Sequence, residues 1–348
     1  MEKRPILSVI IPVYNGEKFI QRSILSVLKQ PCAQHIELIV VNDGSTDNTL
    51  SICEELSKLY RNLKVISKQN EGVAIARNTG IWSSTGKYVA FLDCDDWWVE
   101  NFFTLDVLDL LDEDYDLYRF AFYQVSPSRK FRKLHTVNRK ESRELHPDPS
   151  REYSYAHCSY IYNRSLLIEN KIFYPNFKAH EDWPFVHLAV TMASSIRQVD
   201  RVFLCYWMNS KSCLHTITAQ EKMAENVSSL QAEETLFQKR GFSISTDRER
   251  LSTIVDLLPE LCSELSFRET LHFLQGDLYS LLCQNEIKPW ASLQKRQRIF
   301  QRAPFLFWVK SKIHPGVYKA IKQALNACKF TQPIAELLQY KFLYRWSQ

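Results

Sequence analysis

The stretch that decides the fold runs from Tyr88 to Trp98 and reads YVAFLDCDDWW. Its apolar first half leads directly into three carboxylates, Asp93, Asp95 and Asp96. A short run that is apolar at every position is typical of a strand buried on both faces of a parallel sheet. The sequence therefore predicts a buried strand that carries negative charge to one edge of a sheet.

Three similar runs precede this strand, and helical patterns separate all four. The runs LSVIIPVY, IELIVVND and LKVIS begin at Leu7, Ile36 and Leu63. Apolar residues recur with helical spacing between them, over residues 17–30, 45–60 and 71–84. Strands and helices in alternation predict right-handed crossovers and a doubly wound, mostly parallel α/β sheet.

The later part of the chain is expected to extend the sheet and then to become helical. We predict a helix from about Val99 to Leu111, a strand over residues 115–125 and then a polar, basic surface insertion. A helical pattern near the end of the chain places a domain boundary near Ala219. The expected domains are residues 1–218 and a helical, basic C-terminal region, residues 219–348.

Composition excludes several classes of protein. The chain has 348 residues, of which 45% are hydrophobic and 24% charged, so it is neither disordered nor too small for a large core. The nine cysteines are scattered without CxxC spacing, which favours reduced thiols in the cytoplasm. No apolar stretch is long enough to span a membrane, and no signal-peptide cleavage site follows the short apolar run near the N-terminus.

Polar residues gather where the four predicted strands end. They are Tyr14 and Asn15, Asn42 and Asp43, residues 67–70 and residues 93–96. Doubly wound sheets bind their ligands at the carboxyl ends of the strands. These polar ends therefore predict a ligand site on one rim of the sheet, although strand-end loops are polar in most proteins.

The three aspartates indicate a cation. In an extended segment Asp93 and Asp95 point to the same side, about 7 Å apart. Carboxylates this close raise one another's pKa unless a cation lies between them. Mg²⁺ or Mn²⁺ prefers one or two carboxylates together with phosphate oxygens, which favours a metal–diphosphate ligand. The alternative is that the aspartates cap a helix that starts near Trp97.

Two residues on neighbouring segments are candidates for the same ligand. Asp43, in VVNDGSTD, can accept an N–H from a planar base, while Ser45 and Thr46 after it are expected to cap the next helix. Arg77, in NEGVAIARNTG, can donate to a base or a phosphate, or it forms a surface ion pair.

Four motifs in this order resemble the nucleotide-sugar domain of family 2 glycosyltransferases, which have the GT-A fold. They are VIIPVYNGEKFI, VVNDGSTDNT, NEGVAIARNTG and FLDCDDWW, within residues 7–98. YNRSLLIENKIFYPNFKAHEDWPF and VFLCYWMNSKS extend the resemblance to about residue 213. The resemblance implies a nucleotide-sugar half over about residues 1–98 and an acceptor half over about residues 99–218.

The resemblance, with the residue chemistry above, assigns roles to single residues. The expected donor-binding residues are Pro12, Val13, Tyr14, Asn15, Asp43, Arg77 and Asp93. Asp95 and Asp96 are the expected ligands of Mn²⁺ or Mg²⁺. Glu181, Trp97 and Lys211 are expected near the acceptor or the diphosphate; Lys211 is the one basic residue in YWMNSKS, where many relatives carry arginines.

Asp182, in AHEDWPF, is expected to be the catalytic base. Relatives place an E-D pair at the start of a helix near the acceptor, and its Asp is the base. The base takes the proton of the acceptor hydroxyl on the face opposite the leaving diphosphate, so the configuration at the anomeric carbon inverts. The alternative for Glu181 and Asp182 is that they cap this helix and complement its dipole.

The expected reaction is the transfer of one sugar, from a UDP-sugar by family habit, to a hydroxyl of a glycan acceptor. The Q-x-x-R-W of polymerising relatives is not matched, because FLYRW has Phe342 in place of the glutamine. A nucleotidyltransferase is one alternative, but PVYNGEKF is a poor phosphate loop. A non-catalytic nucleotide-sugar-binding module is the other, and it would not need Asp182.

The C-terminal segment is strongly basic. From Trp290 to Gln348 there are 11 Lys and Arg against one acidic residue, which gives the segment a charge of +10 and leaves −5 for the rest. Together with Phe305, Leu306, Phe307 and Trp308, this charge predicts a peripheral contact with an anionic membrane, on the inner face of the cell membrane. It also predicts a lipid-linked acceptor in bacterial capsule, O-antigen or lipooligosaccharide synthesis. The alternative is a helical subdomain that packs on the catalytic domain; nucleic-acid binding is not expected.

Overall fold

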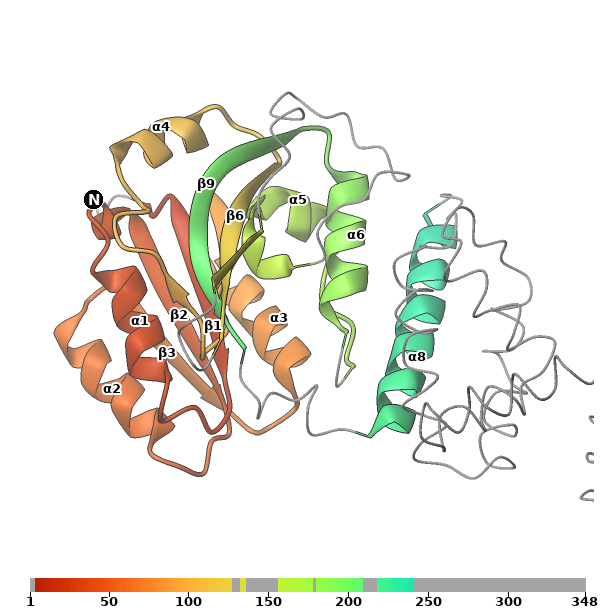
Figure 1. Cartoon of the computed structure of the whole chain (residues 1–348), viewed down its shortest axis with the longest axis horizontal. Helices are drawn as coiled ribbons and strands as arrows, with labels where there is room; N and C mark the ends of the chain where they lie inside the picture. Colours follow the sequence, from red (N-terminus) through yellow and green to blue (C-terminus); the bar gives the residue numbers. More distant parts are fainter. Residues whose placement is uncertain (1–3, 127–131, 136–155, 178–179, 209–217, 241–348) are drawn as a thin grey trace, which may run out of the picture. The chain divides into compact units, whose positions relative to one another are not determined.

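The computed structural model describes residues 4–126, 132–135, 156–177, 180–208 and 218–240. The strands in these ranges form one nine-stranded sheet in the order β3-β2-β1-β4-β8-β6-β9-β5, with β7 beside β6 (Figure 1). The first four strands of this order are parallel, as predicted. Their bounds are β1 Leu7–Val13, β2 Ile36–Asp43, β3 Leu63–Lys68 and β4 Tyr88–Phe91.

Helices cover both faces of this parallel half of the sheet (Figure 1). Helices α1 (Ile20–Leu28) and α2 (Thr49–Leu59) share one buried cluster with Val9 and Ile11 of β1. Helix α3 (Val73–Ser83) covers the opposite face. It lies very close to β1, because a Cβ added at Gly80 would be 2.3 Å from the Ile10 side chain. Because helices cover both faces, β1, β2 and β4 are buried along almost their whole length, whereas the edge strand β3 keeps exposed residues.

The second half of the sheet mixes strand directions. β8 (Tyr160–Asn163) pairs antiparallel with both β4 and β6 (Leu117–Val125), and β9 (Ile196–Trp207) runs parallel to β6. β7 (Arg132–His135) pairs with the end of β6, so part of the predicted surface insertion extends the sheet. The helical elements of this half are α4 Leu105–Asp112, η3 His157–Ser159, α5 Arg164–Glu169 and α6 Asp182–Met192, while η1 (Ala33–His35) precedes β2.

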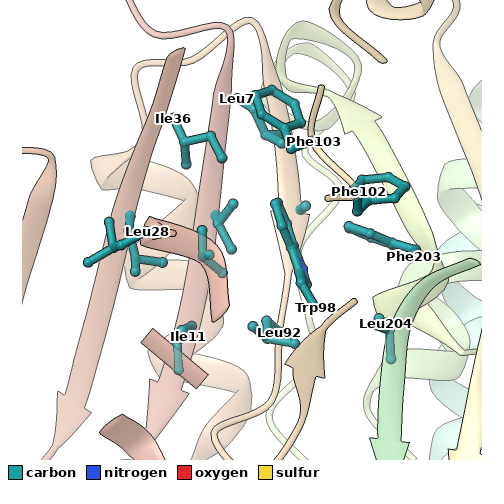
Figure 2. Close-up of a cluster of buried hydrophobic side chains, with 14 of the residues drawn as sticks. Leu7, Ile11, Leu28, Ile36, Leu92, Trp98, Phe102, Phe103, Phe203 and Leu204 are labelled. Carbon is teal, nitrogen blue, oxygen red and sulfur yellow. The ribbon is translucent and has the colours of Figure 1, made fainter. Parts of the chain in front are cut away.

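The helix predicted from about Val99 begins later, as α4 at Leu105. The residues after the aspartates instead form β5 (Trp97–Trp98), which pairs antiparallel with β9. Trp98 is buried, and its ring packs on Phe102 and Phe203 (Figure 2). Burial of these large rings against β9 outweighs the local helical pattern. The alternative that the aspartates cap a helix starting near Trp97 is therefore wrong.

The chain divides into two compact units, the first Met1–Thr216 with Thr235–Gly241 and the second Ile217–Glu234 with Phe242–Gln348. The last described element is α8 (Ala219–Gln238), and its residues are divided between the two. The predicted domains stay a prediction. No helix in the described ranges is long and apolar enough to cross a membrane. Lys211, residues 136–155 and the basic segment from Trp290 lie outside those ranges.

Candidate active site

The ends of β1 and β2 are joined by hydrogen bonds from the loop after each strand. Asn15 has a positive φ of 50°; its backbone N–H donates to Ser45 Oγ at 2.9 Å, and its Oδ1 accepts from Thr46 N at 2.8 Å. The predicted caps Ser45 and Thr46 thus bind Asn15, and α2 begins only at Thr49, with Asn48 as the N-cap. Asn15 therefore shapes the rim of the site.

The predicted nucleoside pocket combines buried and exposed residues. Pro12 and Val13 are buried in β1, while the side chain of Tyr14 is 51% exposed just beyond it. Asp43 is buried at the end of β2, where it accepts from Lys68 Nζ and Gly72 N, each at 2.8 Å. Tyr14 is thus accessible to a ligand, whereas Asp43 also holds β3 and the start of α3.

Asp93 to Asp96 form a turn, in which Asp96 N donates to Asp93 O at 3.0 Å. The segment is therefore not extended, and the expected separation of about 7 Å for an extended segment does not apply. Asp93 accepts from Arg77 Nη2 at 2.8 Å and remains 27% exposed. Burial opposes ionisation of Asp93, but the charge of Arg77, followed by that of His157, holds its pKa below the ordinary value.

Asp96 points into the protein. It is fully buried, and its Oδ1 accepts from the backbone N–H of Trp207 at 2.7 Å, which ties the turn to the end of β9. Its Oδ2 is buried and has no hydrogen-bond partner in the described ranges. Burial, followed by the charges of Asp93 and Asp95, raises the pKa of Asp96 well above the ordinary value. Asp96 is thus better suited to hold the turn than to meet a metal ion that arrives from solvent.

Asp95 and Trp97 lie beside a cationic side chain that the sequence did not single out. Arg22 of α1 donates from Nη2 to the backbone oxygen of Asp95 at 2.5 Å. Its guanidinium also lies 3.9 Å from the centre of the Trp97 ring and 5.6 Å from that of Trp207. Both tryptophans are partly exposed. These contacts place a flat aromatic surface next to the aspartate turn.

Arg77 links the two halves of the site. It is buried in α3, where Nη2 donates to Asp93 Oδ1 and Nη1 donates to Glu181 Oε1 at 2.5 Å. Its guanidinium also lies 5.1 Å from the centre of the Tyr174 ring. Burial opposes the charge of Arg77, but the two carboxylates outweigh it and raise its pKa well above the ordinary value. The ion pairs of Arg77 are therefore buried, not at the surface as the alternative had it. Its contact with the donor stays a prediction.

Glu181 and Asp182 stand at the start of α6, as predicted. Glu181 occupies the N-cap position but makes no capping hydrogen bond with its side chain; it is buried against Arg77. Burial raises the pKa of Glu181 above the ordinary value, although Arg77 opposes that shift. The side chain of Asp182 is 24% exposed. The pair thus consists of one buried carboxylate and one that solvent and ligands can reach.

His157, at the start of η3, was missed from the sequence. Its Nδ1 lies 3.4 Å from Asp182 Oδ2, and its Nε2 lies 3.8 Å from Asp93 Oδ1. Asp93, Arg77, Glu181, Asp182 and His157 thus lie in one cluster, which we call the carboxylate circuit; Glu181 and Asp182 are joined in it as neighbours in the chain. No local motif marks His157, and its partners stand 64 and 25 positions away in the chain. This distance in sequence explains why pattern reasoning did not find it.

Asp95 and Asp96 are the two expected metal ligands, and their surroundings differ. In the described ranges, no group of three or more His, Cys, Asp or Glu side chains is arranged to hold a metal ion. Mg²⁺ needs only one or two carboxylates when phosphate oxygens and water complete its shell. Asp95, in the turn and partly exposed, fits that requirement, whereas Asp96 points inward.

Known proteins resemble the part of the chain that contains the aspartate turn and Arg77. The model of Glycosyl transferase family 2 matches residues 8–170. The chain is 31% identical over 219 residues to the glycosyltransferase EpsJ of Bacillus subtilis (strain 168), covering 60% of this chain and 62% of EpsJ. It is 32% identical over 188 residues to the minor teichoic acid biosynthesis protein GgaB of the same organism, covering 53% of this chain and 21% of GgaB.

A solved structure has the same fold. A fragment of S. aureus TarS in complex with UDP-GlcNAc superposes with a TM-score of 0.57 at 20% identity, covering 85% of this chain and 91% of that fragment. At this identity the likeness shows the GT-A fold alone. The chain spans less than two thirds of the length of EpsJ. The ordered motifs, the GT-A sheet and the family match lead to one conclusion: residues 8–170 form a domain of the family 2 glycosyltransferase type.

Proposed function

We propose that this protein transfers one sugar from a nucleotide sugar, with UDP as the nucleotide, to a hydroxyl group of a glycan acceptor, with inversion. The carboxylate circuit carries this proposal. Asp93 follows β4 on the donor side, and Asp182 begins α6 on the acceptor side. His157 lies within 3.8 Å of the one and 3.4 Å of the other. A partly exposed carboxylate thus stands on each side of one compact site.

The roles of the residues follow from the chemistry of an inverting transfer. Asp182 takes the proton of the acceptor hydroxyl as its oxygen bonds to the anomeric carbon. The bond from that carbon to the diphosphate breaks, and the nucleoside diphosphate leaves with the electron pair. Tyr14 is exposed beside the buried end of β1, where it can stack on the base. The complex of TarS with UDP-GlcNAc is consistent with a UDP-sugar as the donor.

A divalent metal ion, Mn²⁺ or Mg²⁺, would be held by Asp95 and by the donor's phosphate oxygens. When bound, such an ion neutralises the charge that builds up on the leaving diphosphate. Asp96 would contribute indirectly, by keeping the turn attached to β9 through Trp207. Trp97, next to Arg22, offers an aromatic surface for a sugar ring of the acceptor.

The first experiment is a donor panel. Full-length protein is incubated with UDP- and GDP-sugars, with Mn²⁺ or EDTA, and the release of nucleoside diphosphate and the mass of any product are recorded. We expect release from a UDP-sugar in Mn²⁺ and much less in EDTA. Release of pyrophosphate from UTP and a sugar 1-phosphate, supplied in a parallel incubation, would instead identify a nucleotidyltransferase. Binding of a donor without turnover would identify a binding module.

The metal assignment has its own test in Asp95→Ala. This variant is expected to abolish Mn²⁺-dependent transfer and to weaken the binding of UDP in Mn²⁺, while UDP binding in EDTA remains as in the wild type. Titration calorimetry measures both affinities. Full activity of Asp95→Ala in EDTA would contradict the metal assignment.

We further propose that the acceptor is lipid-linked, in bacterial surface-glycan synthesis, and that the basic C-terminal segment holds the protein on the inner face of the membrane. The likeness to GgaB, which is named for teichoic acid biosynthesis, supports the surface-glycan class. Each Lys or Arg near an anionic surface contributes about 1 kcal/mol. Full-length protein should therefore float with anionic vesicles at low salt and be released at high salt, and replacing Lys319, Lys322 and Lys329 by Gln should weaken flotation.

A further inference from the structure

We propose that His157 is a positioning residue for Asp182, and that its Nδ1–H holds the carboxylate of the proposed base in the orientation that accepts the acceptor's proton. The inference rests on the proposed function and adds to it a residue outside the sequence motifs. It follows from three features of the site: the contacts of the ring, its burial, and its link to the donor side.

The contact with Asp182 determines which ring nitrogen carries the proton. An ionised carboxylate only accepts hydrogen bonds, so Nδ1, at 3.4 Å from Asp182 Oδ2, must be the donor. The distance is long for a hydrogen bond, as is common for catalytic contacts before a ligand is bound. With Oδ2 held by the ring, Oδ1 of Asp182 remains for the acceptor hydroxyl.

The His157 ring is buried, and its packing fixes its position. His157 is buried, and its ring packs edge-on against Phe91 of β4 and Tyr174. Its backbone oxygen accepts from the hydroxyl of Tyr162 at 3.0 Å. Phe185 of α6 packs against the same rings, stacked on Tyr174 and edge-on to Phe91. The imidazole and the first turn of α6 are thus fastened to one aromatic cluster, which limits the movement of His157 relative to Asp182.

The second nitrogen connects the base to the donor side. Nε2 is buried without a hydrogen-bond partner in the described part of the chain, and it lies 3.8 Å from Asp93 Oδ1. That separation is too long for a hydrogen bond, so Asp93 does not hold the ring in the way that Asp182 does. The two ring nitrogens therefore have separate roles: Nδ1 positions Asp182, and Nε2 faces the donor-side carboxylate without binding it.

Two substitutions separate these roles. In His157→Asn the side-chain amide nitrogen stands near the former Nδ1, and in His157→Gln it stands near the former Nε2. The kcat is that for release of nucleoside diphosphate from the donor that the wild type uses on the panel. We expect His157→Asn to keep this kcat within about threefold of the wild type. We expect His157→Gln to lose about 10-fold to 100-fold in kcat, less than the ~10²–10⁴ that a general base contributes. The KM for the donor and the affinity for UDP should stay within about threefold in both variants.

His187→Asn is the matched control, because His187 is also buried and lies in α6. Its ring packs on Phe237, which is not part of the carboxylate circuit, so the kcat of His187→Asn should equal that of the wild type. Melting temperatures of all variants identify any general loss of structure. Equal kcat in His157→Gln and wild type, or equal losses in His157→Asn and His157→Gln, would overturn the positioning role. A wild type without turnover on the donor panel would overturn the proposed function, and this inference with it.

Discussion

Two turns carry the carboxylates of the site, and they bury negative charge in different ways. In the turn after β4, Asp96 is buried against a backbone N–H, that of Trp207. At the start of α6, Glu181 is buried against the guanidinium of Arg77. Burial raises the pKa of both groups; the charges of Asp93 and Asp95 add to this rise for Asp96, whereas the charge of Arg77 opposes it for Glu181. A nearby cation thus offsets part of the cost of burying a carboxylate, and nearby carboxylates add to that cost.

Each turn also keeps a carboxylate that solvent can reach. Asp93 and Asp182 are each about a quarter exposed. Of the buried carboxylates, Asp96 accepts from the backbone of Trp207, and Glu181 pairs with the side chain of Arg77. The comparison teaches that neighbouring acidic residues in this site have separate tasks: the buried ones hold the structure of the site, and we propose that the exposed ones contact the ligands. Substitutions that keep shape but remove charge should distinguish the two tasks.

The largest effect is expected from Arg77→Met. It leaves two carboxylates, Asp93 and Glu181, without their cation, and breaking a buried ion pair costs about 3–5 kcal/mol. Denaturant unfolding measures the loss. Arg201→Met is the control, because Arg201 also binds a carboxylate and lies over an aromatic ring but is partly exposed, so about 0–1 kcal/mol is expected. Similar losses in both variants would refute the special role of the buried pair.

Asp182→Asn should leave the fold intact and remove the proposed base. We expect turnover to fall ~10²–10⁴-fold while the affinity for UDP is unchanged. Steady-state kinetics and titration calorimetry check the two halves of this prediction. Turnover within a few-fold of the wild type would mean that another group accepts the proton.

A smaller effect is expected from Asp96→Asn. The amide oxygen can still accept from Trp207 N, and a neutral side chain replaces a carboxyl whose ionisation is disfavoured by burial. Its activity at saturating Mn²⁺, and the Mn²⁺ concentration for half activity, should therefore stay within about threefold of the wild type. A loss as large as that of Asp95→Ala would show that Asp96 is a metal ligand and that the site rearranges when the ion binds.

The pH dependence of stability gives the smallest effect. Because the pKa of Glu181 is raised in the folded protein, the folded state binds the proton more tightly than the unfolded state does. The resulting stability is complete below the unfolded pKa, about 4.3, and is lost as the pH rises through the folded pKa. Glu181→Gln removes this dependence. As the pH is raised from about 4, the unfolding free energy of the wild type should fall relative to that of Glu181→Gln. A rise would show that folding lowers the pKa of Glu181 instead of raising it.

The parallel half of the sheet could be predicted from the sequence in detail. Its four strands, three helices and polar rim follow from patterns within ten to fifteen residues, because strands buried on both faces are apolar throughout and amphipathic helices repeat every 3.6 residues. The GT-A fold and the start of α6 at the E-D pair, which the resemblance to family 2 glycosyltransferases implied, are also confirmed. Local signals were sufficient wherever the relevant contacts lie close together along the chain.

The aspartate turn, β5 and the carboxylate circuit were decided by tertiary structure. Trp97 and Trp98 form a strand because β9, more than 100 residues later, supplies the hydrogen bonds and the aromatic partners. Arg77 became buried because Glu181, 104 positions away, meets it. The sequence by itself determined which chemical groups the site contains. Which carboxylate is buried, which is exposed, and which histidine stands between them depended on packing between distant segments, where burial and charge pairing outweigh local propensity.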